Sequence, residues 1–130
     1  MLKIYIYKNV ENYNIADRQE SEDVLLDNAK VVEVKGEFIK VLSNGYTHYL
    51  SSDKVFAVVE LNESSFSFRN NTDNIYIYCT EENYNAERPN VTLNGVKVVD
   101  AAGSFIKIED NNNCTHYISS KKVLSVVEGY

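Results

Sequence analysis

Short runs in which apolar and polar residues alternate cover most of the chain, and turn-forming residues separate them. Alternation with a period of two is typical of strands that bury one face, because successive side chains point to opposite sides of a sheet. In the first part of the chain we expect strands at residues 4–7, 30–34, 37–42, 46–50 and 54–59. Gly36 and Gly45 lie in turns between these strands. The pattern therefore predicts an all-β fold.

The same pattern occurs twice along the chain. Residues 4–14 reappear with few changes at 75–85, and residues 47–60 reappear at 115–128. The offset is 71 residues in the first block and 68 in the last, so some loops differ slightly in length between the copies. Two copies of five short strands predict two similar small five-stranded antiparallel barrel-like units in tandem.

The boundaries of the two units follow from the ends of the repeat. We expect a first β-barrel repeat at 1–62, a linker at 63–74 and a second β-barrel repeat at 75–130. A unit of about 60 residues buries too little surface to be more than marginally stable alone. The two units are therefore expected to pack against each other or against a second chain, which leaves a homo-oligomer open.

Alternation within the strands also assigns side chains to inner and outer faces. Lys40 should point to water, which puts Ile39 inside, and the same reasoning puts Val32 inside. Phe38 then lies on the outer face with Lys40, and Phe105 does so in the second copy. A large aromatic residue on the outer face of both copies is expected where the copies contact each other.

The order of these elements resembles that of small SH3-like and Sm-like β-barrels. A first strand is followed by a long irregular loop, a three-stranded meander, a one-turn connector at 50–54 and a last strand at 55–60. In the second copy, residues 91–95, 105–109 and 118–128 are similar to the strand rhythm of Sm-like barrels. The resemblance implies a small barrel fold for each copy but no site residues. The chain has no Trp for the groove of an SH3 domain, and the basic RNA-facing positions of Sm rings are not evident.

We expect neither a membrane-spanning nor a secretory segment in this sequence. No apolar run approaches the roughly 18 residues that a membrane span needs. The N-terminus lacks the apolar core of a signal peptide, so a cytoplasmic protein is expected. Cys79 and Cys114 both lie in the second copy, whereas a disulfide framework would repeat with the unit. We therefore expect two reduced thiols.

The net charge is −6, from 13 basic and 19 acidic residues. A nucleic-acid binder neutralises phosphates with clustered Lys and Arg, so nucleic acid is not an expected partner. Opposite charge steers the encounter of two proteins, which favours a basic protein surface as the partner. The alternative is that the charge only keeps the protein in solution.

One repeated sequence, Thr-His-Tyr-(Leu/Ile)-Ser-Ser at 47–52 and 115–120, is the candidate for catalysis. On a strand His48 and Ser51 point to opposite faces, so the imidazole cannot activate the hydroxyl. His48 and His116 are therefore expected to be packing residues beside apolar neighbours on their own strands. We find no catalytic, metal-binding or cofactor-binding motif, and we expect a protein that is not an enzyme.

Repeated tyrosines and asparagines indicate binding to another protein. If Ile4 and Ile6 face the core, the tyrosines of the first strands face outward, and exposed tyrosine suits protein interfaces. The two Asn-Tyr-Asn triplets lie in the long loop, where functional residues concentrate. A competing interpretation is that the tyrosines cover the barrel surface and the asparagines form turns. The candidate partner-binding residues are Tyr5, Tyr7, Asn12, Tyr13, Asn14, Tyr76, Tyr78, Asn83, Tyr84 and Asn85.

Three functions remain open from the sequence. The first is a non-enzymatic binding protein that engages another protein through an acidic, tyrosine-rich surface. The composition prompts the hypothesis that this protein is a phage- or mobile-element-encoded inhibitor of a host defence nuclease. The second is a small-molecule or nucleotide-binding protein that holds its ligand between the two repeats. The third is a single-stranded oligonucleotide-binding barrel, which the pI near 4.9 disfavours.

Overall fold

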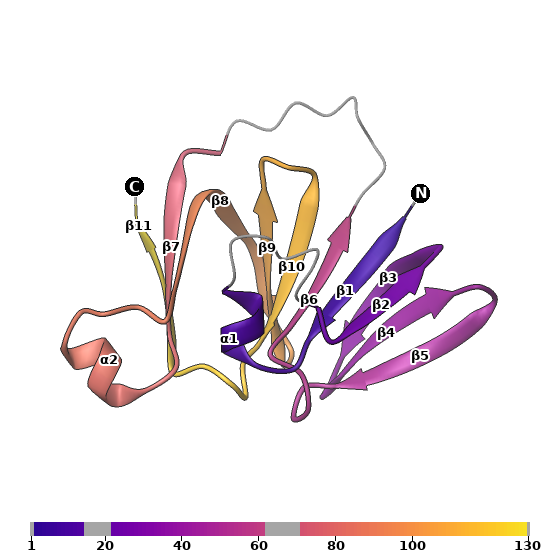
Figure 1. Cartoon of the computed structure of the whole chain (residues 1–130), viewed down its shortest axis with the longest axis horizontal. Coiled ribbons are helices and arrows are strands. Elements are labelled where there is room, and N and C mark those ends of the chain that lie inside the picture. The colour runs from indigo at the N-terminus through magenta and orange to yellow at the C-terminus, as the bar shows by residue number, and fades with distance from the viewer. Residues whose placement is uncertain (1, 15–21, 62–70, 130) are drawn as a thin grey trace.

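The structure, a computed structural model, describes residues 2–14, 22–61 and 71–129. These residues form antiparallel strands and two short helices (Figure 1). The strands are β1 (Lys3–Tyr7), β2 (Val24–Asp27), β3 (Ala29–Lys35), β4 (Phe38–Ser43), β5 (Tyr46–Ser51), β6 (Ala57–Leu61), β7 (Asp73–Tyr78), β8 (Val91–Ala102), β9 (Phe105–Asp110), β10 (Cys114–Ser119) and β11 (Ser125–Gly129). The helices are α1 (Val10–Tyr13) and α2 (Glu81–Asn85).

The strands form two open sheets. One sheet has eight strands in the order β11-β7-β8-β9-β10-β6-β1-β2, and the other has three in the order β3-β4-β5. The predicted all-β class is confirmed. The prediction of two five-stranded barrels is wrong, because the larger sheet contains strands from both halves of the chain. β10 of the second half pairs with β6 of the first, with Tyr117 opposite Val58, and this pairing joins the halves.

Each half places its strands in the same order, β6-β1-β2 with β3-β4-β5 in the first and β11-β7-β8-β9-β10 in the second. The halves differ at one turn. Asn28 adopts a positive φ of 48° and separates β2 from β3, and its side chain donates to Asn44 Oδ1 at 3.1 Å. Gly95 occupies the corresponding position inside the continuous strand β8. Gly95 has a φ of +68°, a conformation that favours glycine, and a Cβ there would lie 2.9 Å from Asn111 Nδ2, so the Asn111 side chain would have to move.

The predicted boundaries meet the described residues only in part. The predicted linker 63–74 lies mainly outside them, because residues 62–70 are not described, and β7 begins inside the predicted linker at Asp73. The long loop after β1 contains the one-turn helix α1. Its residues 15–21 also lie outside the described ranges.

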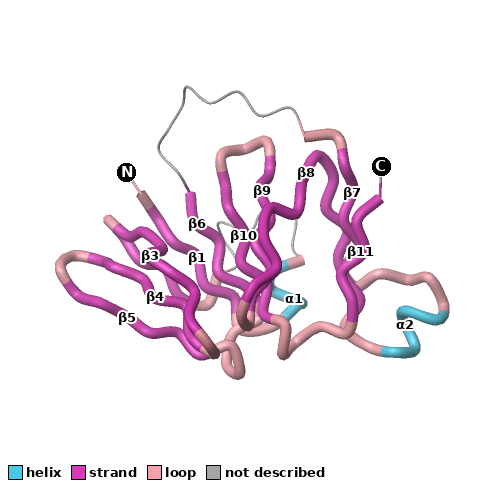
Figure 2. The backbone as a smooth tube through the Cα atoms, turned by 180° about the vertical axis from the view of Figure 1, so that it is seen from behind, coloured by secondary structure: helices cyan, strands magenta, loops and turns pink. Residues whose placement is uncertain are grey.

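Two open sheet edges lie at opposite ends of the molecule. In the described ranges, β5 pairs only with β4 and β11 pairs only with β7. Figures 1 and 2 both show β5 at one end and β11 at the other, with α2 at the same end as β11. An open edge presents backbone N–H and C=O groups that a strand of another chain can pair with.

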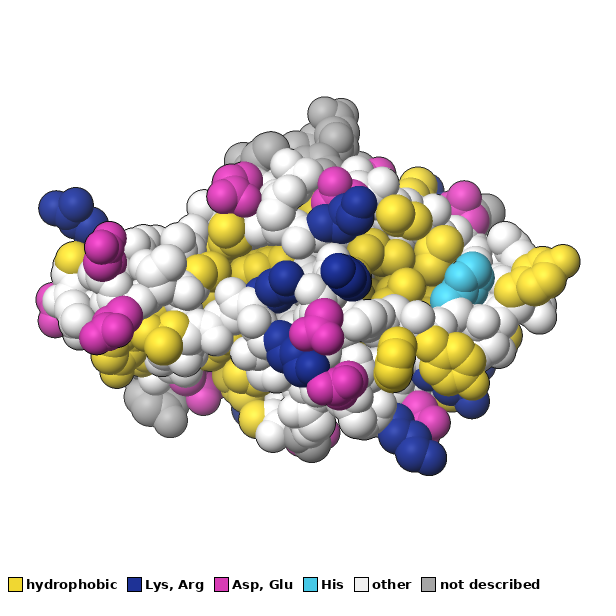
Figure 3. Space-filling model, turned by 90° about the horizontal axis from the view of Figure 1, so that it is seen from below, with side chains coloured by type: hydrophobic (Ala, Val, Ile, Leu, Met, Phe, Trp, Pro, Cys, Tyr) yellow, Lys and Arg dark blue, Asp and Glu magenta, His cyan; other side chains and the backbone are white. Residues whose placement is uncertain are grey.

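The surface seen from below mixes charges of both signs. Lys, Arg, Asp and Glu side chains are interspersed on this face, and hydrophobic side chains reach the surface beside a histidine at one end (Figure 3). Within the part of the chain that the structure describes, neither helix has the length and apolar character to cross a membrane.

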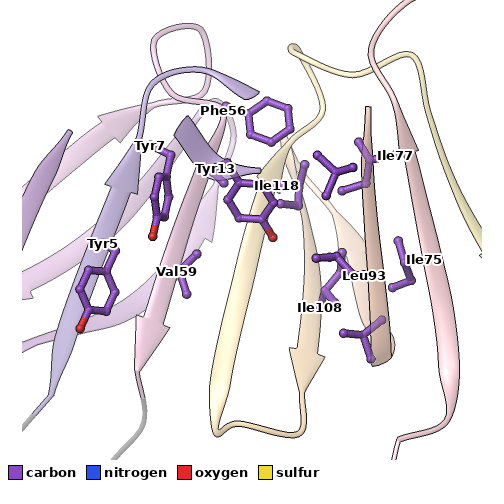
Figure 4. Packing of buried hydrophobic residues seen from close by; sticks show 13 residues of the cluster. Tyr5, Tyr7, Tyr13, Phe56, Val59, Ile75, Ile77, Leu93, Ile108 and Ile118 are labelled. Atoms are coloured by element: carbon purple, nitrogen blue, oxygen red, sulfur yellow. The ribbon is translucent and has the colours of Figure 1, made fainter. Parts of the chain in front are cut away.

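Buried side chains form two clusters, and each contains residues of both halves. Figure 4 shows the larger cluster, in which Tyr5, Tyr7, Tyr13, Phe56 and Val59 of the first half pack against Ile75, Ile77, Leu93, Ile108 and Ile118 of the second. The smaller cluster contains Ile4, Ile6, Ile39, Val41 and Val58 of the first half with Phe105 and Tyr117 of the second. Both faces of β1 and β6 are therefore buried, because these strands lie between the two clusters.

The predicted inner and outer faces hold for some positions and not for others. Ile39 is buried as expected, and Phe105 lies at the contact between the halves, as expected of an outward aromatic residue. The same expectation is wrong for Phe38, which is exposed and lies outside that contact. Val32 is exposed, although alternation put it inside. A β-bulge shifts the register of β3 and β4 between Val31 and Glu33, which turns Val32 outward.

Candidate functional site

A buried polar network joins the two halves of the chain. The Tyr13 hydroxyl on α1 lies 2.7 Å from His116 Nδ1 on β10, and His116 Nε2 lies 2.7 Å from Asp110 Oδ2 at the end of β9. Tyr13 and His116 are buried. An ionised carboxylate can only accept, so Nε2 carries a hydrogen, and in the neutral ring Nδ1 accepts from the tyrosine hydroxyl.

Local backbone structure holds the two ends of this network. The side chain of Asn9 caps α1 by accepting the backbone N–H of Asn12 at 2.9 Å, which fixes the helical turn that carries Tyr13. Asp110 Oδ1 accepts the backbone N–H of Asn112 at 2.8 Å and of Cys114 at 3.0 Å. Burial alone would raise the pKa of Asp110, but the hydrogen bond from His116 and these two N–H groups bring it below its usual value.

A carboxylate that orients a histidine is also a feature of acid–base catalytic sites. Here the hydroxyl that would be activated belongs to Tyr13, whose side chain has no exposed surface. A cavity of about 250 Å³ is lined by His116, Asp110 and Asn111 among others, and Tyr13 is not part of its lining. A substrate in this cavity would meet His116 and Asp110 but not the tyrosine hydroxyl. The network thus connects α1 of the first half to β9 and β10 of the second.

Apolar packing and backbone pairing complete what we call the inter-half contact. Its residues are Tyr13, Phe56, Phe105, His116 and Tyr117, together with the β6–β10 strand pair. Burial raises the pKa of Tyr117 well above its usual value, with further contributions from nearby Glu60 and Glu109. Burial also raises the pKa of Glu60, although the backbone N–H of Val31 bonds to its carboxylate. These are the effects expected of groups withdrawn from water.

The backbone of β10 shows which way its amides point. Ser120 N–H donates to the carbonyl of Ser104 at 2.8 Å, on the β9 side, and Ser119 N–H donates to the carbonyl of Phe56 at 2.9 Å, on the β6 side. Successive residues of a strand direct their N–H groups to opposite neighbours. Tyr117, two residues before Ser119, therefore bonds to β6 as well.

The same reasoning applies to the open strand β5. Ser52 N–H donates to the carbonyl of Glu37 at 2.9 Å, on the β4 side. The backbone groups of Tyr49 and Thr47 and the N–H of Ser51 therefore point away from β4, to the open edge, whereas the Ser51 carbonyl accepts the N–H of Lys54 at 3.1 Å. These residues correspond to Ser119, Tyr117 and Thr115, which face β6 in the second half.

Corresponding aromatic residues of the two halves differ sharply in exposure. Phe105 and Tyr117, at the inter-half contact, are 2% and 6% exposed. Their counterparts Phe38 and Tyr49, on the open β5 side of the first half, are 45% and 62% exposed. The surface that is buried at the inter-half contact in the second half is thus exposed in the first half.

An apolar groove of about 340 Å³ lies beside Tyr49. We call it the open groove, and it is lined by Ile6, Lys8, Val24, Leu26, His48, Tyr49, Leu50, Ser51, Lys54 and Val55. In the second half the residues that correspond to Ile6, Val24, Leu26, His48 and Leu50 are Ile77, Val91, Leu93, His116 and Ile118, and all of these are buried. Tyr13 lies on this second set, in contact with His116 and close to Ile118 (Figure 4).

The opposite end of the molecule exposes the complementary residues. Tyr13 and Phe56, which cover the groove of the second half, are 0% and 2% exposed. Their counterparts Tyr84 on α2 and Leu124 before β11 are 46% and 53% exposed. The molecule therefore has an uncovered groove at one end and the side chains that would cover such a groove at the other.

The tyrosines predicted as binding residues fall into two groups. Tyr5 and Tyr7 are buried, so the prediction that they face outward is wrong, and Tyr13, predicted as a binding residue of the long loop, is buried as well. The reason is that β10 pairs beside β6 and brings the second half against the outer face of β1. Tyr76 and Tyr78 of the second half are half-buried, and Tyr84 is exposed as expected.

Three of the four asparagines predicted as binding residues form hydrogen bonds with other parts of the chain. Asn12 donates to the Asp23 carboxylate, and Asn14 Nδ2 donates across the halves to the carbonyl of Asn90 at 2.9 Å. Asn83 is half-buried, and its N–H is capped by Thr80 Oγ1 at 3.1 Å. Asn85 is exposed at the end of α2. The asparagines of both triplets reach the surface to similar extents, and the two triplets differ in their tyrosines, because Tyr13 is buried and Tyr84 is exposed.

The sequence did not predict the open groove or the role of Leu124. Leu124 corresponds to Phe56, and this pair is not among the repeated tyrosines from which binding residues were predicted. The signal that was present is the pair Phe38 and Phe105, which alternation placed on the outer face. His116 is buried as predicted, and His48 is half-buried in the wall of the open groove.

A second cavity, of about 250 Å³, lies between the two halves. Its lining includes Val32 and Glu33 of β3 and Asp100, Lys107 and Tyr117 of the second half. The alternative function of binding a small molecule or nucleotide between the two repeats would use a cavity in this position. The described residues contain no group of three or more His, Cys, Asp or Glu side chains that could hold a metal ion. Within the same residues neither Cys79 nor Cys114 forms a disulfide.

Corresponding residues of the two halves can be compared with each other. No protein-family model, curated protein or solved structure matches the chain. The differences in exposure between corresponding residues, such as Tyr49 and Tyr117, therefore point to the surfaces that are open for binding.

Proposed function

We propose that the protein is a non-enzymatic protein-binding protein built by tandem duplication of a small β unit related to SH3-like and Sm-like barrels. The recurrence of residues 4–14 at 75–85 and the same strand order in both halves support the duplication. The binding surface is the β5 edge with the open groove, and the partner is a protein that adds a strand to this edge.

The observation that carries this proposal is the pairing of an open edge with an apolar groove. The outward backbone groups of Thr47 and Tyr49, with the N–H of Ser51, provide hydrogen bonds for an added strand. The groove beside them accepts apolar or aromatic side chains of the partner, and Phe38 and Tyr49 add exposed aromatic surface. Backbone pairing supplies affinity, and the groove supplies specificity.

The charge of this surface differs from the acidic surface expected from composition. Lys8 and Lys54 lie in the wall of the open groove. Acidic residues gather instead on α2, where Glu81 and Glu82 lie in the first turn. A basic partner, including the host defence nuclease hypothesised from composition, would thus contact the α2 end rather than the groove.

Burial supports the absence of catalysis. The hydroxyl of Tyr13 is buried against His116. Tyr13 would have to leave the inter-half contact before its hydroxyl could react with a substrate. A Tyr–His–Asp network with such burial is better suited to stabilise a fold than to turn over a substrate.

The test uses three versions of the protein as bait in an affinity capture from cells. Tyr49→Pro removes an N–H from the open β5 edge without removing one that bonds to β4. Tyr49→Val makes a similar loss of the tyrosine ring but keeps the N–H. A partner captured by the wild type and by Tyr49→Val but not by Tyr49→Pro supports strand addition. A partner captured equally by all three contradicts it.

The second candidate function is small-molecule binding in the cavity between the halves. The observation that favours it is that Lys107 and Asp100 provide opposite charges beside the aromatic rings of Phe105 and Tyr117. The cavity of about 250 Å³ is slightly smaller than the roughly 300–1,000 Å³ of most ligand sites. A nucleotide that raises the melting temperature of the wild type but not of Lys107→Ala would support this function.

A further inference from the structure

We propose that the partner at the open groove is a second copy of this chain. In this assembly β5 of one copy pairs with β11 of the next, in the register that β10 and β6 use within the chain. The inference rests on the proposed function, because it names the partner of the same surface. It accounts for the open surfaces at both ends of the molecule.

The backbone of both edges fits this pairing. Within the chain, Tyr117 lies opposite Val58 and His116 opposite Val59. The corresponding register between copies places Tyr49 opposite Val126 and His48 opposite Val127.

The amides of β11 point the right way for such a bond. Val58 lies opposite Tyr117 and directs its backbone groups to β10, whereas its neighbours Ala57 and Val59 face β1. Just before β6, the Phe56 carbonyl accepts from Ser119 of β10, and the Phe56 N–H donates to the Tyr7 carbonyl of β1. Val126 corresponds to Val58, and its backbone groups point away from β7. Leu124 corresponds to Phe56, and its N–H donates to the Tyr78 carbonyl of β7 at 2.8 Å, so only its carbonyl takes the role that the Phe56 carbonyl has toward β10. The two open edges therefore present complementary rows of N–H and C=O groups.

The side chains of the two ends are complementary as well. Tyr13 covers the second-half groove and contacts His116, and its ring packs edge-on against Tyr7 at 5.4 Å between centroids. Tyr84 is held in the same way by Tyr78, edge-on at 5.2 Å. Placed like Tyr13, Tyr84 of one copy enters the open groove of the next and meets His48.

The remaining apolar contact follows the same correspondence. Leu124 takes the place that Phe56 takes inside the chain, beside the strand it pairs with. The assembly buries Tyr49, Phe38, Tyr84 and Leu124, which are among the large hydrophobic side chains most exposed in the described residues. In the assembly, a neighbouring copy thus buries at each end of the molecule the residues whose counterparts are buried at the inter-half contact.

Charges at the two ends also match. At the inter-half contact Glu11 of α1 and Lys122 after β10 line one cavity of about 230 Å³. Their counterparts are Glu82 on α2 and Lys54 in the wall of the open groove. These two residues lie at opposite ends of one molecule, and the assembly brings Glu82 of one copy near Lys54 of the next.

The two surfaces in this contact are different, so the contact is heterologous. Repeated use of a heterologous contact builds a ring when the rotation closes and a filament when it does not. A symmetric dimer that pairs β5 with β5 would instead leave β11 open. The two arrangements can be distinguished by blocking one edge at a time.

The experiment uses purified protein alone and measures mass by light scattering over a range of concentrations. Tyr49→Pro blocks the β5 edge and Val126→Pro blocks the β11 edge, and neither removes an N–H that bonds to a neighbouring strand of its own chain. Tyr49→Val and Val126→Ile are the matched controls that keep the N–H. Circular dichroism and the melting temperature of the dilute monomer verify that every variant is folded.

We expect the wild type and both controls to form species larger than the monomer. Each proline variant should associate at least 100-fold more weakly, and an equimolar mixture of the two proline variants should form a 1:1 dimer and nothing larger. A wild type that stays monomeric at millimolar concentration overturns the inference. Self-association by folded Val126→Pro that equals that of the wild type also overturns it. Since no other protein is present, these failures are separate from the capture experiment that tests protein binding.

Discussion

Tyr13→Phe removes a single hydroxyl from the inter-half contact and keeps the ring. In the structure this hydroxyl lies 2.7 Å from His116 Nδ1, and the ring packs against Tyr7, Phe56 and His116. The phenylalanine ring can keep these ring contacts. The substitution therefore tests the hydrogen bond across the halves separately from the packing.

The expected loss of stability follows from burial. His116 is 2% exposed, so its Nδ1 cannot replace the tyrosine hydroxyl with a water molecule from the surface. Leaving a buried polar atom without its hydrogen bond costs about 1–3 kcal/mol. We expect the free energy of unfolding to fall by about 2 kcal/mol, and the melting temperature of a domain of this size to fall by roughly 8 °C.

Tyr84→Phe is the matched control, because Tyr84 is the exposed counterpart of Tyr13. Its free energy of unfolding should stay within about 0.5 kcal/mol of the wild type. Both variants are unfolded with urea at a protein concentration at which light scattering shows only monomers. Contacts between copies then do not contribute to the measured free energy of unfolding. Equal stability of Tyr13→Phe and the wild type would refute the assignment of a structural hydrogen bond. Equal losses in both variants would refute the difference between the two halves.

Two further predictions concern the same contact. The pKa of Asp110 is lowered from the ordinary 3.8 in the folded protein, so its ionised form contributes stability above that value and loses it as the pH falls through the lowered pKa. Urea unfolding between about pH 5 and pH 2 should therefore depend less on pH in Asp110→Asn than in the wild type, and identical slopes would contradict the pairing with His116. Phe56→Ala should lower the free energy of unfolding by about 3–5 kcal/mol because the ring is buried between the halves. The exposed counterpart change Leu124→Ala should cost the monomer less than about 1 kcal/mol, and calorimetry showing similar losses for both would contradict the packing.

Most strands could be predicted from alternation and turn residues. The expected strand at 37–42 is observed as β4 (Phe38–Ser43), and that at 46–50 as β5 (Tyr46–Ser51). β2 was missed in the first half because Val24, Leu25 and Leu26 are consecutive apolar residues without alternation. The bulge near Val32 was missed because one extra residue in a strand leaves the local composition unchanged.

The burial of Tyr5 and Tyr7 depends on a contact between distant segments. Alternation assumes one wet face, whereas β1 is covered on both faces once β10 pairs beside β6. Pairing between residues about 60 positions apart leaves no local pattern in the sequence. The nearly continuous apolar run Ile4-Tyr5-Ile6-Tyr7 is itself typical of a strand buried on both faces, and this was the available signal.

The candidate site could not be found from the repeat alone. Tyr13 and Tyr84 lie in nearly identical sequences, yet one is buried and the other exposed. When two halves are joined through one contact, one groove and one edge strand remain exposed. The sequence of a single half does not show which groove and which edge these are. Only the order of the strands, with β6 beside β10, decides it.

The register between copies is tested most directly by disulfide trapping between two differently marked chains. Inside the chain His116 lies opposite Val59, and the proposed contact places His48 of one copy opposite Val127 of the next. Opposite residues that do not exchange backbone hydrogen bonds have Cα atoms about 4.5 Å apart, which a disulfide can bridge.

In chains whose Cys79 and Cys114 are replaced by serine, His48→Cys protein is mixed with Val127→Cys protein under mild oxidation. The control mixture pairs Val127→Cys with Thr47→Cys, whose side chain points to the other face of β5. We predict that the first mixture forms a disulfide-linked dimer on a non-reducing gel and that the control mixture does not. Equal yields in the two mixtures, or no linked dimer in the first, would contradict the account.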